Sequence, residues 1–270
     1  MKSVIIVDLC DAHVPFEDEK VVKAAIEFCE WIQPTIIITH EWMDFYELSR
    51  FVKNPLMATG YTLHEAREKV WYWYRKIKRA CPDSYRVELN ANHPKRLQKY
   101  LHSNASELCG LPEFEMDTFM KYSKMGIKLM NYYNFRDYLF KHGDIVRKYS
   151  GYTARGELEK EGMSGASGHS HRLGQHYSTK RGGKYAWMEC GCLCRMDMEY
   201  LEDKVADWQH GLGLVVFNGE TKHFTSLPLA IIDNEVPLLR LFQNIKEEGK
   251  DDRDRSRKGN RVKERGKAGM

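Results

Sequence analysis

Short apolar runs that stop at polar side chains recur along the first hundred residues, and they constrain the fold more than any other feature. Residues 4–9 and 35–39 are β-branched runs with the length of buried strands, and 87–89 is a third candidate. Residues 19–32 carry apolar side chains at helical spacing, and Asp18 can cap that helix. This alternation predicts a layered α/β domain whose loops converge at the strand ends.

Capping and turn signals place further elements. Thr62 and Glu65 form a capping-box pattern at the start of a long helix that should end near Ala80. The strand candidates in the second half are residues 128–133, 185–194 and 214–217. Asn218-Gly219 follows the last of these and is a strong hairpin signal, so the chain should turn back there into another strand.

Length and composition fit one main domain followed by a charged tail. The 270 residues are enough for a sizeable core, and we expect the domain to span 1–245 with a helical insertion at 100–126. Residues 246–270 hold ten basic and six acidic side chains and supply the whole net charge of +4, since the remainder has 32 of each. This segment lacks the apolar side chains that a core needs, so we expect a disordered tail. Weak binding of the tail to nucleic acid is the alternative.

The number of cysteines and the N-terminal sequence indicate the cellular compartment. Seven cysteines, an odd number, favour a reducing environment, and no apolar run reaches the ~20 residues of a membrane span. The N-terminus has no signal-peptide cleavage pattern, so we expect a cytoplasmic protein without a membrane segment. Cys190, Cys192 and Cys194 alternate along a predicted strand and are expected to be small core side chains rather than a soft-metal site.

Side chains that can bind metal follow five of the segments. Carboxylate oxygen and imidazole nitrogen suit hard and borderline divalent ions. Each stretch alone is a weak signal, because a surface or core histidine is the commoner explanation for any one of the eleven. Their order along the chain, with one or two structural elements between them, favours a shared site. The stretches are Asp11-Ala12-His13, Glu41 with Asp44, Asn92-His93, His142-Gly143 and His169-Ser170-His171.

This order resembles that of the calcineurin-like metallophosphoesterases, including their bacterial and phage members. The family pattern runs D-x-H, G-D-x-x-D, G-N-H-[ED], H and G-H-x-H. The resemblance implies a four-layer α-β-β-α sandwich with two divalent metal ions, manganese, iron, zinc or nickel, at the strand ends. By position, Asp11, His13 and His171 would bind one ion, Asn92, His142 and His169 would bind the other, and Glu41 would bridge them. His93 would protonate the leaving alkoxide and Asp44 would orient His93.

Two blocks depart from the family pattern. The G-D pair reads His40-Glu41, and G-N-H-[ED] reads Ala91-Asn92-His93-Pro94. Glutamate is one methylene longer than aspartate, so Glu41 is expected to disturb the bridge between the ions. His40 and Ala91 replace glycines, which should strain turns that favour positive φ. Pro94 is expected at the first position of the next helix.

Two functional hypotheses follow. The first is a soluble, dinuclear metal-dependent phosphoesterase that acts on a phosphomonoester or phosphodiester, with nucleotides or nucleic acids as compatible substrates. The alternative is a weak or inactive family member that binds nucleic acid or protein, because Glu41 replaces the bridging aspartate. Retention of the other ligand positions favours the enzyme. Arg50, Arg96 and Arg172 could donate to phosphate, but solvated surface charge is the simpler explanation for them.

Overall fold

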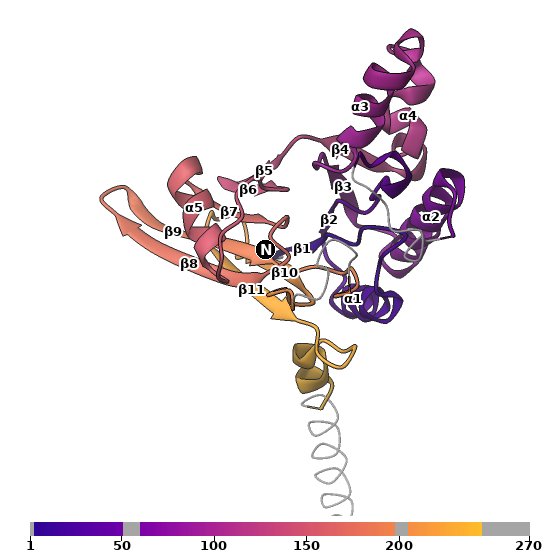
Figure 1. The fold of residues 1–270 in the computed structure, drawn as a ribbon. Helices are drawn as coiled ribbons and strands as arrows, with labels where there is room; N and C mark the ends of the chain where they lie inside the picture. The colour runs from indigo at the N-terminus through magenta and orange to yellow at the C-terminus, as the bar shows by residue number, and fades with distance from the viewer. Residues whose placement is uncertain (1–2, 51–59, 198–204, 245–270) are drawn as a thin grey trace, which may run out of the picture.

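The computed structural model describes residues 3–50, 60–197 and 205–244, so the predicted tail at 246–270 lies outside the described residues. Two β-sheets pack against each other, and helices cover the outer side of each sheet (Figure 1). The predicted four-layer α-β-β-α sandwich is therefore confirmed.

The six-stranded sheet contains the three strands expected near the N-terminus. Its strands are, in order, β11 (Phe224–Ala230), β10 (Gly211–Phe217), β1 (Val4–Cys10), β2 (Ile36–His40), β3 (Tyr85–Leu89) and β4 (Ile127–Met130). Strands β1 to β4 run parallel, and the first three lie within two residues of the predicted bounds. The predicted hairpin is also confirmed, since β10 and β11 pair antiparallel up to Phe217 and Phe224, on either side of Asn218.

Helices α1 (Glu19–Ile32), α2 (Leu63–Ala80) and α3 (Lys95–Asn104) cover the outer face of this sheet. The Asp18 carboxylate accepts hydrogen bonds from the first turn of α1, and the predicted capping box opens α2. Pro94 lies at the N-cap of α3, one residue before the predicted position. In 105–126 the chain forms 3₁₀ turns and the short helix α4 (Met116–Met120); whether 100–126 is a separate insertion stays a prediction.

The parallel strands are buried on both faces, as their apolar runs predict. On β1, Val7 and Leu9 face the helices, whereas Ile6 and Cys10 face the second sheet. This alternation is the period of two expected for a strand. The inner core between the sheets combines side chains from both of them, including Ile6 and Cys10 of the six-stranded sheet and Phe140 and Ala166 of the five-stranded sheet.

The five-stranded sheet departs most from the sequence-based expectation. Its order is β5 (Tyr133–Phe135), β6 (Tyr138–Lys141), β7 (Ser164–Ser167), β9 (Gly183–Cys190) and β8 (Leu173–Lys180), and α5 (Tyr152–Glu161) covers its outer face. The predicted strand at 128–133 is wrong as a single element, because β4 and β5 belong to different sheets. The strand predicted at 185–194 ends at Cys190.

Three strands of this sheet, β6, β7 and β8, were not predicted. The sequence of β7 is Ser-Gly-Ala-Ser, which lacks the usual apolar signal. Small residues are required there because a Cβ on Gly165 would lie 2.4 Å from the carbonyl oxygen of Leu139 and 2.6 Å from the ring of Trp187. Among the described residues, none of the helices combines the length and the apolar character of a membrane span.

A buried carboxyl between the six-stranded sheet and its helices should make folding stability depend on pH. Burial raises the pKa of Glu88 from its ordinary 4.5 to about 7, although the hydroxyls of Thr39 and Tyr74 donate to it. The contribution of the neutral carboxyl to the free energy of unfolding is thus fully present below pH 4.5 and is lost as pH rises through 7. The loss is on the order of 3 kcal/mol.

We expect Glu88→Gln, which stays neutral, to unfold at higher urea than the parent at pH 8 and at similar urea near pH 4.5. The matched control is Glu27→Gln on the exposed face of α1, which should show no such pH-dependent difference. A Glu88→Gln effect that is equal at both pH values would contradict the assignment.

Candidate metal centre

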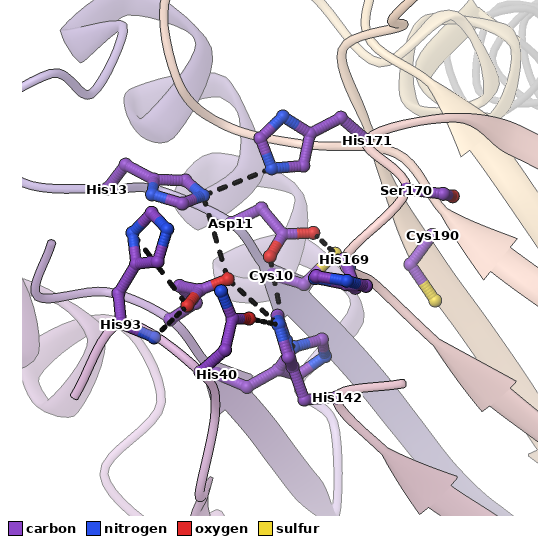
Figure 2. A network of polar contacts seen from close by, with 12 residues as sticks. Cys10, Asp11, His13, His40, His93, His142, His169, Ser170, His171 and Cys190 are labelled. Carbon is purple, nitrogen blue, oxygen red and sulfur yellow. Dashed lines mark hydrogen bonds and ion pairs between the residues drawn. The ribbon is translucent and has the colours of Figure 1, made fainter. Parts of the chain in front are cut away.

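The predicted ligands lie at the carboxyl ends of five strands, three from one sheet and two from the other. The chain segments after β1 and β2 continue side by side, because the backbone amides of Asp11 and His13 donate to the carbonyls of His40 and Glu41, both at 3.0 Å. Asn92 follows β3, and from the second sheet His142 follows β6, while His169 and His171 follow β7. Figure 2 shows these segments pointing their side chains toward a common centre.

Much of this site is buried, and it opens on one side. Asp11, His13, Glu41, His142 and His171 are at most 5% exposed. Asn92 is exposed, and His93 and His169 are partly buried. The site is therefore open to solvent at Asn92, in the loop that follows β3.

The backbone at the site adopts an unusual conformation. Five non-glycine residues have φ between 52° and 64°: Asp11, His13, Glu41, His169 and His171. The left-handed region costs roughly 1–2 kcal/mol for a residue with a Cβ, and such strain gathers at functional sites. The expectation of strain at His40 and Ala91 is wrong, since neither has a positive φ; His40 is the last residue of β2, and the turn begins at Glu41.

The first group of ligand atoms comes from Asp11, His13 and His171, and these atoms lie within 4.8 Å of one another. The Nε2 atoms of His13 and His171 are 3.0 Å apart. Oδ2 of Asp11 accepts from the backbone of His169 at 2.8 Å, but Oδ1 is buried and has no hydrogen-bond partner among the described residues. Burial lowers the pKa of His171 to about 3, so its ring is neutral and can offer a lone pair. This donor set fits a divalent cation.

The second group comes from Glu41, His142 and His169, again within 4.8 Å, with Asn92 beside them. The amide oxygen of Asn92 lies 2.6 Å from Nε2 of His142, 3.2 Å from Nδ1 of His169, and 3.1 and 3.2 Å from the two carboxylate oxygens of Glu41. Its neighbours are atoms that carry lone pairs. With the amide turned, its nitrogen can donate to these neighbours. A divalent cation there would instead be held by Asn92, Glu41, His142 and His169.

Glu41 lies between the two groups. Its Oε2 is 2.8 Å from Nε2 of His142 in the second group and 3.8 Å from Nε2 of His13 in the first. Its Oε1 accepts from the backbone amide of His93 at 2.7 Å. Burial raises the pKa of this carboxyl, but His142 and His13 outweigh burial and hold the pKa well below its usual range. The glutamate thus reaches both groups as a carboxylate, and its bridging role stays a prediction.

The predicted proton donor lies at the edge of the first group. Nδ1 of His93 is 2.8 Å from Oδ2 of Asp44, and Nδ1 of His13 is 2.9 Å from the same oxygen. Although burial alone would raise it, hydrogen bonds from His13 and His93 hold the pKa of Asp44 well below its usual range. Asp44 therefore stays ionised and can orient both rings.

Arg96 belongs to this cluster, although sequence reasoning set it aside as surface charge. Its Nη1 donates to Oδ1 of Asp44 at 2.5 Å, and its Nη2 lies 3.0 Å from Nε2 of His93. The signal that could have identified it is the three-residue spacing from His93, since the turn before α3 brings the two residues together and the backbone amide of Arg96 donates to the carbonyl of His93 at 2.8 Å. The other two arginines have partners elsewhere, Arg50 at Ser103 and Arg172 at Asp207.

Two buried residues behind the second group were also missed. The ring of His40 lies between Nδ1 of His142 and Oδ1 of Asp8, at 3.0 Å from each. Burial disfavours the charged ring, but Asp8 and the neighbouring Asp11 outweigh burial and raise the pKa of His40 to about 9. The sequence shows His40 only as a departure from a glycine pattern.

The three thiols near the end of β9 are buried, as predicted for core side chains. They do not share one strand face, because β9 ends at Cys190, while Cys192 and Cys194 form isolated bridges with other segments. Sγ of Cys194 lies 3.8 Å from Nδ1 of His171, and Cys192 lies within 4.8 Å of both, so these two thiols pack directly behind the first group.

Comparisons with known proteins give relatives without a stated activity. No family model matches the chain. The chain is similar to the gene 54 protein of Mycobacterium phage D29, with 28% identity over 227 residues that cover 79% of this chain and 89% of the relative. The gene 54 protein of Mycobacterium phage L5 is 27% identical over 228 residues, covering 80% and 89%.

Among solved structures, vacuolar protein sorting 29 from Cryptosporidium parvum is similar over 86% of this chain and 94% of its own, with 11% identity and a TM-score of 0.43. Identities and a score of this size assign no activity. The functional conclusion therefore depends on the geometry of the site itself.

Proposed function

We propose that this protein is a two-metal phosphoesterase that hydrolyses a phosphomonoester or a phosphodiester. One observation carries the proposal: seven ligand-type side chains from five separate segments meet at the strand ends in two adjoining groups, with the Glu41 carboxylate between the groups. A paired arrangement of this kind suits two cations close together, which is the arrangement used for phosphoryl chemistry.

The residues divide between two ions. Asp11, His13 and His171 would hold one ion, Asn92, His142 and His169 the other, and Glu41 both. Two divalent ions there, manganese, iron, zinc or nickel, would supply charge for the phosphoryl oxygens and an activated water.

His93 would give a proton to the leaving oxygen. Its Nδ1 is directed at Asp44, which leaves Nε2 as the ring atom that can give a proton to the substrate. In this structure Nε2 faces Arg96, whose two terminal nitrogens form a fork. A bound phosphate would draw the guanidinium toward itself, since arginine pairs with phosphate in a bidentate manner. Nε2 would then be free to take up a proton from solvent and give it to the leaving oxygen. Nucleotides and nucleic acids are substrates that this chemistry accommodates.

The test is an assay of the full chain after removal and replacement of its metal. Protein stripped with chelator and reloaded with Mn²⁺, Ni²⁺, Zn²⁺ or Mg²⁺ is given an activated aryl phosphomonoester and a diester, and the bound ions are counted by elemental analysis. We expect hydrolysis of at least one of the two esters to appear when metal is restored. Protein that binds two ions and turns over neither ester would contradict the proposal and favour the binding-module alternative.

A further inference from the structure

We propose that Asp8 and His40 are positioning residues that fix the ring of His142 for its ion. The inference rests on the proposed function, because it concerns one ligand of the second group. It depends on a chain of hydrogen bonds that leads away from the site into the core, from His142 through His40 to Asp8.

The geometry gives Nδ1 of His142 and both ring nitrogens of His40 one hydrogen-bond partner each. Nε2 of His142 faces Glu41 and Asn92, the side on which an ion would be held, while Nδ1 faces Nδ1 of His40 at 3.0 Å. The carboxylate oxygen of Asp11 is 3.7 Å from the same Nδ1, too far for a hydrogen bond. On the other side of its ring, Nε2 of His40 is 3.0 Å from Oδ1 of Asp8.

A bound ion sets the direction of these hydrogen bonds. With a cation on Nε2, Nδ1 is the only nitrogen of His142 that can carry a proton, so it must donate to Nδ1 of His40. His40 then carries its own proton on Nε2 and donates it to Asp8. Through these hydrogen bonds, the buried Asp8 carboxylate, which can only accept, fixes the tautomer of His40 and so the tautomer of His142. Without an ion, a charged His40 can donate in the opposite direction, so the proposed direction belongs to the ion-loaded protein.

Burial makes this chain necessary. Metal-binding histidines usually donate their second N–H to a carboxylate, a carbonyl or water. Here both His40 and Asp8 are fully buried, so solvent does not compete for the N–H of His142. The second oxygen of Asp8 accepts from the thiol of Cys190 at 3.6 Å, which holds the carboxylate in place.

The ring of His40 also fits its space closely. A Cβ on Gly168 would lie 2.5 Å from Cε1 of His40, so the absence of a side chain at that glycine admits the ring. The imidazole occupies a position for which the resemblance predicts a glycine, and it fills that space with an acceptor aimed at His142. The departure at His40 therefore adds support behind the metal centre.

The test measures ion affinity, with activity as a separate readout. Zn²⁺ and Mn²⁺ are titrated calorimetrically into metal-free Asp8→Asn, His40→Phe, His40→Asn and the parent. Phenylalanine keeps the ring volume and has no acceptor, whereas the amide oxygen of asparagine can take the place of Nδ1. Thr39→Val is the matched control, since Thr39 is buried beside His40 and bonds to Glu88 instead of the ligands.

We expect Asp8→Asn and His40→Phe to lower the affinity for one of the two ions by about 10- to 100-fold. His40→Asn should recover part of that loss, and Thr39→Val should leave both affinities unchanged. In zinc-loaded parent protein, nitrogen-15 spectra should show the proton of His142 on Nδ1. Should His40→Phe fail to fold, Asp8→Asn and the spectrum still decide.

The outcomes separate the two proposals. Unchanged affinities in Asp8→Asn and His40→Phe, in an active enzyme, overturn the positioning role and leave the phosphoesterase intact. Weakened binding in these variants, with a parent that binds two ions and hydrolyses no ester, supports the positioning role and overturns the phosphoesterase. A parent that binds no ion overturns both.

Discussion

Replacing His93 by alanine is expected to lower kcat by about 10²- to 10⁴-fold, the usual effect of losing a positioned proton donor. The ring is oriented by Asp44 at 2.8 Å and lies at the open side of the site. Its loss leaves the departing oxygen without a proton donor but removes no ligand of either group. The bound ions should therefore stay at the parent number. Rates on an ester of a simple alcohol, together with elemental analysis, measure both quantities.

Two further measurements sharpen this result. His102→Ala changes an exposed histidine on α3 and should leave the rate unaltered. An ester whose leaving group needs no proton should also lose less rate in His93→Ala than an ester of a simple alcohol. Equal losses on both esters, or no loss at all, would rule His93 out as the general acid.

The second large effect is expected at Glu41. Its carboxylate lies between the two groups, so Glu41→Gln removes the charge that both ions would share. We expect one ion to be lost and activity to fall by more than about 100-fold, beyond the usual effect of changing a residue that only supports a ligand. Elemental analysis and kcat test the prediction.

The companion substitution Glu41→Asp tests the length of the side chain. From its backbone at φ 56°, Glu41 places Oε2 at 2.8 Å from His142 and at 3.8 Å from His13. An aspartate would draw back from both rings, so we expect weaker binding of one ion than in the parent. Tighter binding or a faster rate in Glu41→Asp would mean that glutamate is the poorer bridge.

The sequence indicated part of the site because ligands at the carboxyl ends of neighbouring parallel strands lie along one edge of a sheet. Asp11, Glu41 and Asn92 follow three consecutive parallel strands, and His142 and His169 follow two strands of the facing sheet. For Asp11, Glu41 and Asn92 this meeting follows from strand order, whereas His142 and His169 follow β6 and β7, which the sequence did not reveal, and were placed in the site by the resemblance.

The parts that sequence could not predict depend on contacts between distant segments. Strand β7 needs a glycine at 165, because a Cβ there would lie 2.6 Å from the ring of Trp187, and the residues of β7 do not reveal this contact. Arg96 turns inward because Asp44 is there to receive it. The effect of a glutamate at position 41 depends on its backbone angle, which a residue pattern does not show.

Each group of ligands draws on both sheets. The first combines Asp11 and His13 of the six-stranded sheet with His171 of the five-stranded sheet, and the second combines Glu41 and Asn92 with His142 and His169. An ion held by either group would therefore be an interlayer cross-link, fastening the two halves of the sandwich at one rim. Binding of metal and stability against unfolding would then be thermodynamically linked, so that metal supply would set the free energy of unfolding as well as the proposed activity.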